Sequence, residues 1–160
     1  MRKAPRPTPQ RLAEVLSYDT ETGVLRRIGT GRVVGNPNGR GYLQLTVDGY
    51  PTLAHRVAWA VAAGQWPKGQ IDHLNGDRSD NRLANLRDVD QFTNMQNMRK
   101  APAGSKTGVL GASTHKLTSK FRSVIRVDAR QKHLGYFDTP EAAHAAYVAA
   151  KREHHPGGTL

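Results

Sequence analysis

The chain has 160 residues, enough for one ordinary domain or two small ones, and only 37% of them are hydrophobic. That content is low for a single large core, so we expect two small domains. The formal net charge of +11 favours a polyanionic partner. The absence of cysteine excludes disulfides and thiolate metal ligands. No apolar run approaches the roughly 20 residues that span a bilayer, and the first ten residues, MRKAPRPTPQ, lack the apolar core of a signal peptide, so we expect an intracellular protein without a membrane partner.

The first 41 residues predict a helix, a turn, a strand and a loop. Pro9 opens the helix. Its apolar residues share one face: Leu12, Val15 and Leu16. The turn YDTETG at 18–23 leads into a strand over 24–28. The glycine-rich stretch at 29–41 lacks the Lys-Ser/Thr ending of a nucleotide-binding loop, so we expect a solvated or DNA-facing hairpin loop there.

The next segment predicts a β-hairpin followed by a helix. Residues 42–49 alternate in polarity and end on Asp-Gly, which is typical of a tight turn. The helix is expected over 54–63, mostly buried, with His55 and Arg56 in its first turn. For His55 the sequence favours a capping or packing role. Arg56 is a candidate phosphate contact, because a guanidinium can grip phosphate oxygens in a bidentate fashion.

Residues 71–94, IDHLNGDRSDNRLANLRDVDQFTN, place Asp72 and His73 side by side, ahead of a closely spaced series of asparagines. A carboxylate and an amide oxygen are hard ligands that suit Mg²⁺ or Mn²⁺. A neutral imidazole, with an ordinary pKa of about 6.5, can take a proton from water near neutral pH. The pattern predicts that Asp72 holds a metal ion and that His73 activates water for attack on a phosphodiester.

The same stretch predicts two strands and a helix enclosing one site. A short strand leads into Asp72 and His73, and the Asn-Gly signal at 75–76 reverses the chain. A second strand is expected over 86–89. Asp90 is then well placed as the N-cap of a helix.

With DH, NRLANLR and TNMQN in this order, the segment resembles the ββα-metal (His-Me finger) core of HNH endonucleases of the phage and intron-homing type. The resemblance implies that Asp72 binds the metal and that His73 is the general base. It also implies that Asn85 ties the loop together and orients the imidazole. Asn94 resembles the final metal ligand, which is histidine in many family members; asparagine there makes the site all-oxygen and favours Mg²⁺. Asn97, one helical turn further, is the second choice.

Each element also has a plainer explanation. Asp-His is a common dipeptide, and asparagine-rich loops are often only turns. A degenerate copy that binds DNA without cutting it, as a non-catalytic regulatory protein, is therefore an alternative to a nuclease. RNA is a third possible target, because positive charge does not distinguish RNA from DNA.

After Asn97 the composition changes to the basic, Pro/Gly/Ser-containing stretch MRKAPAGSKTG, which is typical of a linker. We expect a domain boundary near residue 101. The remainder predicts three strands, within VLGAST, KFRSVIRVDAR and QKHLGYFDT, and an alanine-rich helix, PEAAHAAYVAAKREHH. Thr139 is its expected N-cap, with Pro140 at the first helical position.

This half resembles the APETALA-type DNA-binding domain of plant ethylene-response factors. The matching residues are GV-G at 108–111, F-S-IRV from Phe121 and HLGYFDTPEAA from His133. The resemblance implies that the helix covers one face of a three-stranded sheet while the other face enters the major groove. Leu110 and Ser113 stand where the plant domains have arginine, so base preference does not transfer.

Strand alternation selects the candidate DNA contacts of this domain. Arg122 and Arg126 share the face opposite Ile125, and are the best candidates for reading DNA. Against this, the plainer reading is a solvated sheet face. His133 stands where the plant family has tryptophan. Two further candidates are expected to contact DNA phosphates: Lys116 and Lys132.

The sequence thus predicts an α+β protein with a ββα-metal nuclease core and a small three-stranded antiparallel sheet packed on one helix. The nuclease domain, with its N-terminal extension, is expected at 1–100 and the DNA-binding domain at 101–160. We expect a Mg²⁺- or Mn²⁺-dependent endonuclease that nicks double-stranded DNA as a monomer or weak dimer. The resemblance implies a phage or mobile-element origin and action in the cytoplasm of a bacterial host.

Overall fold

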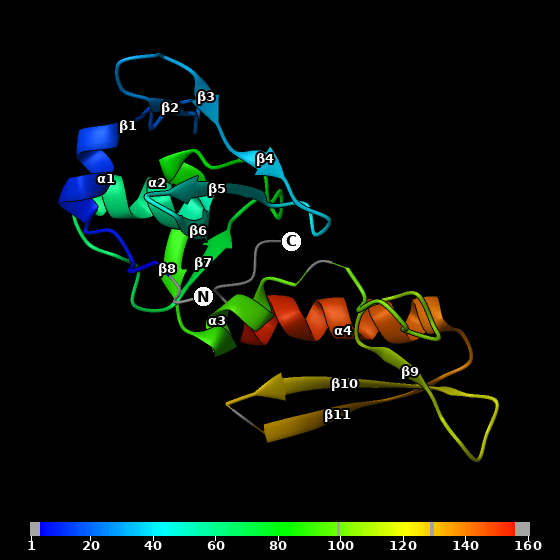
Figure 1. The fold of residues 1–160 in the computed structure, drawn as a ribbon. Helices are drawn as coiled ribbons and strands as arrows, with labels where there is room; N and C mark the ends of the chain where they lie inside the picture. The colour runs from blue at the N-terminus through cyan, green and yellow to red at the C-terminus, as the bar shows by residue number, and fades with distance from the viewer. Residues whose placement is uncertain (1–3, 99, 129, 156–160) are drawn as a thin grey trace. The chain divides into compact units, whose positions relative to one another are not determined.

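The structure is a computed structural model that describes residues 4–98, 100–128 and 130–155. Over these residues it is a mixed α+β protein of short helices and small antiparallel sheets, which confirms the predicted class (Figure 1). The chain divides into two compact units, Met1–Asn94 and Met95–Leu160. Within the described ranges, no helix has both the length and the apolar character needed to cross a membrane.

The division between the units falls inside helix α3 (Gln91–Gln96), earlier than the change in composition. Residues after Asn94 belong with the second unit, where Lys151 of helix α4 (Pro140–His154) donates from Nζ to the Met98 carbonyl oxygen at 2.8 Å. The composition marks the basic linker, whereas packing sets the division. The domain limits 1–100 and 101–160 stay a prediction.

The first unit begins with helix α1 (Pro9–Val15), which is capped by Thr8: its hydroxyl accepts from the Arg11 backbone N–H at 3.1 Å. The sequence placed Leu16 on the apolar face of this helix, but the helix ends at Val15. The Leu16 backbone is extended, and this residue starts an antiparallel three-stranded sheet. The strands are β1 (Leu16–Tyr18), β2 (Leu25–Arg27) and β3 (Val33–Val34).

A second small sheet contains the predicted hairpin. Its strands are β4 (Asn36–Pro37), β5 (Leu43–Val47) and β6 (Tyr50–Leu53). Asp48 and Gly49 connect β5 to β6 with φ values of 49° and 78°, which is the left-handed geometry of a type I′ turn. The stretch 29–41 is not all loop, because β3 and β4 form within it and pair with neighbouring strands.

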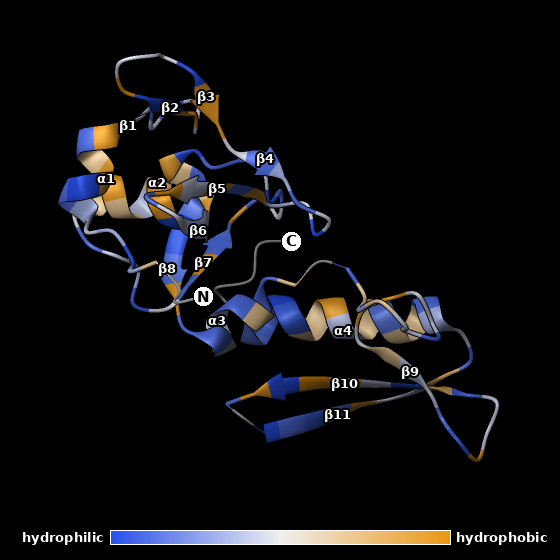
Figure 2. Ribbon diagram, in the orientation of Figure 1, coloured by the Kyte–Doolittle hydropathy of each residue, from blue (hydrophilic) through white to orange (hydrophobic). Residues whose placement is uncertain are grey.

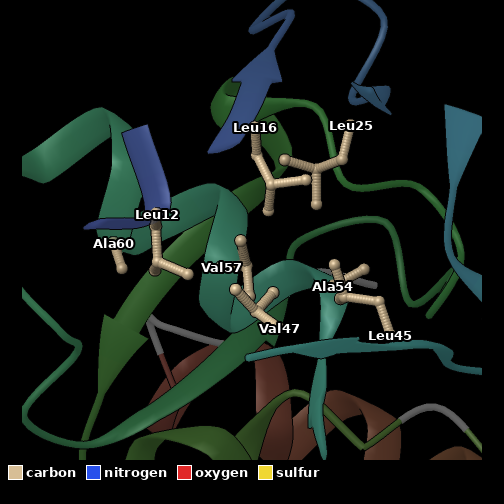
Figure 3. Packing of buried hydrophobic residues seen from close by; sticks show 8 residues of the cluster. All are labelled: Leu12, Leu16, Leu25, Leu45, Val47, Ala54, Val57 and Ala60. Atoms are coloured by element: carbon tan, nitrogen blue, oxygen red, sulfur yellow. The ribbon is translucent and has the colours of Figure 1, made fainter. Parts of the chain in front are cut away.

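Helix α2 (Ala54–Ala63) has the predicted bounds and lies at the centre of the core of this unit. Apolar side chains from α1, β1, β2 and β5 pack with one face of α2 (Figure 3). In this view Leu16 and Leu25 point toward one another, and Val47 lies beside Val57. Gly64 ends the helix with φ 66°, a left-handed conformation that glycine adopts without steric cost. This core anchors the helix that carries His55.

The predicted pair of strands after α2 is present. Strand β7 (Gln70–His73) pairs antiparallel with β8 (Leu86–Val89), with Asp72 opposite Arg87 and His73 opposite Leu86. Ala58, Ile71 and Leu86 form a buried cluster between α2 and the strands. The loop between β7 and β8 contains a 3₁₀ turn over Leu83–Asn85 that was not predicted.

Helix α3 follows β8 with the predicted cap. The Asp90 carboxylate accepts from the Thr93 backbone N–H at 2.8 Å and from the Thr93 hydroxyl at 3.1 Å. A strand, a strand and a helix therefore follow one another over residues 70–96.

The second unit has the predicted three strands and helix. The antiparallel sheet has the order β11-β10-β9, from β9 (Ala112–Thr114), β10 (Phe121–Val127) and β11 (Arg130–Phe137). Helix α4 packs on this sheet (Figure 1). The predicted alternation in β10 is confirmed, since Ser123 and Ile125 are 0% and 1% exposed whereas Arg126 is exposed. The start of β11 is its most hydrophilic part (Figure 2).

Both ends of α4 are fixed by local contacts. Thr139 caps it, accepting from the Ala142 backbone N–H at 3.1 Å, with Pro140 in the first turn as predicted. At the other end, a ring nitrogen of His155 lies 2.7 Å from the Arg126 carbonyl oxygen. The predicted strand over VLGAST is shorter than expected, because residues 109–111 form a turn before β9.

Candidate active site

His73 is the last residue of β7, and its side chain is buried, with 4% of its surface exposed. Its Nε2 lies 3.3 Å from the Asn81 side-chain oxygen. An amide oxygen only accepts hydrogen bonds, so this contact assigns the ring proton to Nε2. The lone pair of the neutral ring is then on Nδ1, which is the nitrogen able to accept a proton.

Burial lowers the pKa of His73, because the protonated ring is poorly solvated inside the protein. The hydrogen bond from the ring to the Asn81 side-chain oxygen and the negative charges of Asp72, Asp77 and Asp80 raise the pKa in part. The net direction is downward, so His73 is neutral at physiological pH. A neutral, oriented imidazole is what general-base catalysis needs.

Two aromatic neighbours enclose His73. The rings of His55 and His73 meet edge to face with centroids 5.1 Å apart, and the Tyr42 ring is 5.2 Å from His55 and 6.0 Å from His73. The Arg78 guanidinium lies 4.9 Å from the Tyr42 ring and donates to the Arg40 carbonyl oxygen at 3.0 Å. The exposed Arg78 guanidinium is therefore held in a defined position beside the three rings.

His55 is neutral for the same reason as His73, and more strongly so. Burial, with the charge repulsion that His73 and Arg56 would exert on a protonated ring, lowers the pKa of His55 to about 3. Its side chain is 4% exposed, and its Nδ1 has no hydrogen-bond partner among the residues that the structure describes. The packing role that the sequence favoured agrees with these contacts.

The low pKa of His55 predicts acid sensitivity. Its folded pKa of about 3 lies below the ordinary 6.5, so the unfolded chain binds more protons between these values and the free energy of unfolding falls as pH drops below 6.5. From pH 7 to pH 5 the loss due to His55 is at most about 2 kcal/mol. Urea unfolding of wild type and His55→Gln at both pH values measures it. A wild-type loss no greater than that of the variant would contradict the assignment.

Asp72 precedes His73 in β7, is buried, and forms an ion pair with Arg87 on the neighbouring strand. Arg87 contacts the Asp72 Oδ2 atom through Nε at 2.8 Å and through Nη2 at 2.7 Å. Asp72 is 6% exposed, and its charge is balanced by the residue directly opposite on β8. Arg87 was not among the predicted site residues, although pairing the two predicted strands end to end, His73 with Leu86, would have placed it opposite Asp72.

Asn94 lies over the face of β7 that carries Asp72. Its side-chain nitrogen donates to the Gln70 side-chain oxygen at 2.5 Å. Gln70 precedes Asp72 by two residues in the same strand, and alternate residues share a face. The structure therefore brings Asn94 to the strand face that carries Asp72, and their predicted role as metal ligands stays a prediction. Asn97, the second choice, belongs to the second unit.

The donor set at this face fits a hard divalent cation. It offers the Asp72 carboxylate and the side-chain oxygen of Asn94, whose nitrogen is used by Gln70. Mg²⁺ is commonly held by one or two protein oxygens with water completing its octahedral shell. Among the described residues, no three His, Cys, Asp or Glu side chains gather into a ligand cluster, so the cation would depend on amide oxygens and water. The Arg87 contact is the opposing feature, because it engages Oδ2.

Asn85 ties the loop between β7 and β8. Its Nδ2 donates to the Asp80 carbonyl oxygen at 2.8 Å, and its Oδ1 accepts from the Asn75 backbone N–H at 2.9 Å. Its own carbonyl oxygen accepts from the Leu74 backbone N–H at 2.9 Å. Asn81 contacts the imidazole and was not among the predicted site residues, although it opens the same NRLANLR run.

Arg56 holds the backbone that enters β7. Its guanidinium donates to the carbonyl oxygens of Gly69 at 3.2 Å and Pro67 at 3.5 Å, and the side chain is partly buried. Gly69 is itself closely packed, since an added Cβ would overlap the Val89 carbonyl oxygen. These contacts give Arg56 a structural task, and its predicted phosphate contact stays a prediction.

In the second unit, the sheet face opposite α4 gathers most of the predicted DNA contacts. Directly opposed residues share a face, and Arg122 pairs with Tyr136, while Val124 pairs with His133. The Tyr136 ring lies 4.7 Å from His133 and 4.8 Å from His115. Arg126, two residues beyond Val124, lies on the same face and is exposed. Cations and aromatic rings are thus interleaved on one surface.

The two lysines predicted to contact DNA lie elsewhere. Lys132 pairs with the buried Ile125, which places it on the side of the sheet that α4 covers. Its ammonium group lies 3.0 Å from the His154 Nε2 atom of α4. Lys116 is exposed in the connection between β9 and β10. The structure does not group Lys132 with Arg122 and Arg126.

Comparison with known families agrees with the first unit. Residues 52–99 match the model of the HNH endonuclease family, a range that includes α2, β7, β8 and α3 with Asp72, His73, Asn85 and Asn94. No curated protein and no solved structure matches the chain. The matched family acts on DNA as a nuclease and generally depends on a divalent metal. Residues 52–99 of this chain are therefore similar in sequence to the HNH endonuclease family.

Proposed function

We propose that the protein is a Mg²⁺- or Mn²⁺-dependent endonuclease of the phage or intron-homing type that nicks double-stranded DNA. The observation that carries this proposal is the buried, neutral His73, oriented by Asn81 and adjacent to Asp72 within a matched HNH segment. Such a group has little purpose in a packed core, where an apolar side chain would avoid the cost of burying an imidazole.

In the proposed reaction, His73 acts as the general base. Its Nδ1 accepts a proton from a water molecule, and the resulting hydroxide attacks the phosphorus atom of a phosphodiester. The bond from phosphorus to the 3′-oxygen breaks on the opposite side. The products carry a 5′-phosphate and, after protonation, a 3′-hydroxyl. Asn81 supports this step by accepting the Nε2 proton, which fixes the tautomer and the ring plane.

Asp72 and Asn94 would hold the divalent cation on their face of β7. When bound, the cation supplies charge stabilisation for the crowded phosphate and the departing oxygen. Arg87 would orient the Asp72 carboxylate through its two contacts with Oδ2. One base and one cation position account for cleavage of one strand at a time, hence nicking by a monomer.

The second unit would hold the DNA near the cut. Its half-buried Arg122 and exposed Arg126, on the same face as the His133 and Tyr136 rings, suit contact with bases and phosphates. The same surface supports the alternative, a DNA-binding regulatory protein that does not cleave. The two functions differ in whether the first unit has activity.

Conversion of supercoiled plasmid to open-circular form, with Mg²⁺ or with EDTA, tests the proposal. We expect metal-dependent accumulation of open circles before linear DNA, and 5′-phosphate ends that ligase can reseal. The same assay on a plasmid library with random inserts offers many candidate sites. If the protein binds these plasmids in a salt-sensitive way but leaves them intact, the regulatory function is supported instead.

A further inference from the structure

The turn Tyr18–Gly23 lies outside the matched HNH segment, and the proposed reaction gives it no role. Its sequence, YDTETG, builds a rigid structure: the Asp19 carboxylate accepts from the backbone N–H groups of Glu21 at 2.9 Å and Thr22 at 3.2 Å. The Gly23 N–H donates to the Asp19 carbonyl oxygen at 2.9 Å. The turn is therefore closed by its own hydrogen bonds before it contacts anything else.

Three contacts join this turn to the loop that orients His73. The Tyr18 hydroxyl donates to the Asn81 carbonyl oxygen at 2.7 Å. The Leu83 backbone N–H donates to the Thr20 carbonyl oxygen at 3.0 Å. A Cβ added to Gly23, whose φ is 75°, would lie 2.6 Å from the Arg82 backbone nitrogen and the Asn81 carbonyl carbon.

These contacts surround Asn81, which is 2% exposed. The Tyr18 hydroxyl holds its carbonyl oxygen, and the Thr20 carbonyl oxygen holds the backbone two residues later. Gly23 packs directly against the Asn81 backbone. The Asn81 side chain then reaches the His73 ring at 3.3 Å. Tyr18 is partly buried, and burial raises its pKa to about 12, so its hydroxyl stays a hydrogen-bond donor at any working pH.

We propose that the Tyr18–Gly23 turn is a positioning element for the general base, acting through Asn81 on the orientation of the His73 ring. Tyr18 is its key residue, because its hydroxyl makes the one side-chain contact of the three. The inference rests on the proposed nuclease function, and it gives the N-terminal extension a part in catalysis.

A double-mutant cycle between Tyr18→Phe and Asn81→Ala tests the coupling. Tyr18→Phe removes one hydroxyl and keeps the ring, while Asn81→Ala removes the imidazole contact and keeps the carbonyl oxygen. We expect Tyr18→Phe to lower kcat about fivefold with KM unchanged. We expect the double variant to cleave no more slowly than Asn81→Ala alone, since the tyrosine acts through the missing amide.

Tyr50→Phe is the matched control, because Tyr50 lies on β6 of the same unit and takes no part in these contacts. It should cleave at the wild-type rate. Gly23→Ala is a second variant that disturbs the same loop through backbone contact, and it should also lower kcat. Thermal melting of each variant corrects the rates for any unfolded fraction. Equal slowing by Tyr18→Phe in both backgrounds, or none in either, would overturn the inference.

A readout without activity separates this inference from the nuclease proposal. In the NMR spectrum of the histidine rings, His73→Ala identifies the His73 resonance. Tyr18→Phe should shift that resonance, and should not shift it further in the Asn81→Ala background. If the His73 resonance does not shift in Tyr18→Phe, the positioning role is wrong even if the enzyme cleaves DNA. A moved resonance in a protein that cuts no DNA would leave the coupling intact and refute the nuclease.

Discussion

Replacing His73 by alanine is expected to lower the rate of plasmid nicking by about 10²- to 10⁴-fold, the range typical of a lost general base. The physical reason is that no water would be deprotonated at the point of attack. The structure gives the ring a fixed tautomer through Asn81 and a lowered pKa through burial. Single-turnover cleavage at saturating protein measures the chemical step without a contribution from product release.

DNA binding is the control for this variant. The affinity of His73→Ala for the same plasmid, measured in EDTA, should equal that of wild type, since the imidazole is 4% exposed and binds no phosphate directly. His154→Ala, which alters a histidine of the other unit, should nick at the wild-type rate. Undiminished cleavage by His73→Ala would remove His73 as the base and leave the matched HNH segment without an assigned one.

Gly111→Ala is expected to give the largest loss of stability in the second unit, about 3 kcal/mol or more. A Cβ at this position would overlap the Tyr147 ring at Cγ, and the backbone has φ 76°, which L side chains rarely adopt. Tyr147 lies in the middle of α4, so the overlap pushes the helix away from the residues leading into β9. Urea unfolding followed by circular dichroism measures the change in unfolding free energy.

Gly108→Ala is the matched control for that prediction. Gly108 has a similar φ of 70°, but nothing lies within 4 Å of an added Cβ. Its substitution should cost about 1 kcal/mol, from the left-handed backbone alone. The difference between the variants isolates the overlap with Tyr147. Equal losses from the two substitutions would show that Tyr147 moves aside at no cost and that the close approach does not hold α4 in place.

Local patterns in the sequence predicted most of the secondary structure. The Asp-Gly turn, the hairpin at 43–53, the bounds of α2, and the Asp90 and Thr139 caps follow from interactions between residues a few positions apart. The errors occurred where longer-range pairing overrides local preference. Leu16 leaves the helix because β1 pairs with β2, and the glycine-rich stretch forms β3 and β4 because neighbouring strands offer hydrogen bonds.

The sequence by itself determined the candidate groups for the proposed chemistry: an adjacent acid and imidazole, an asparagine series at HNH spacing, and a basic second half, with residues 52–99 matching the HNH endonuclease family. Only the tertiary structure decided which side chains contact those groups. Arg87 faces Asp72 from another strand, His55 packs on His73 from a helix, and Tyr18 reaches Asn81 across 63 residues. Motif spacing records neighbours along the chain, whereas orientation, burial and pKa depend on neighbours in space, which form only when the core brings distant segments together.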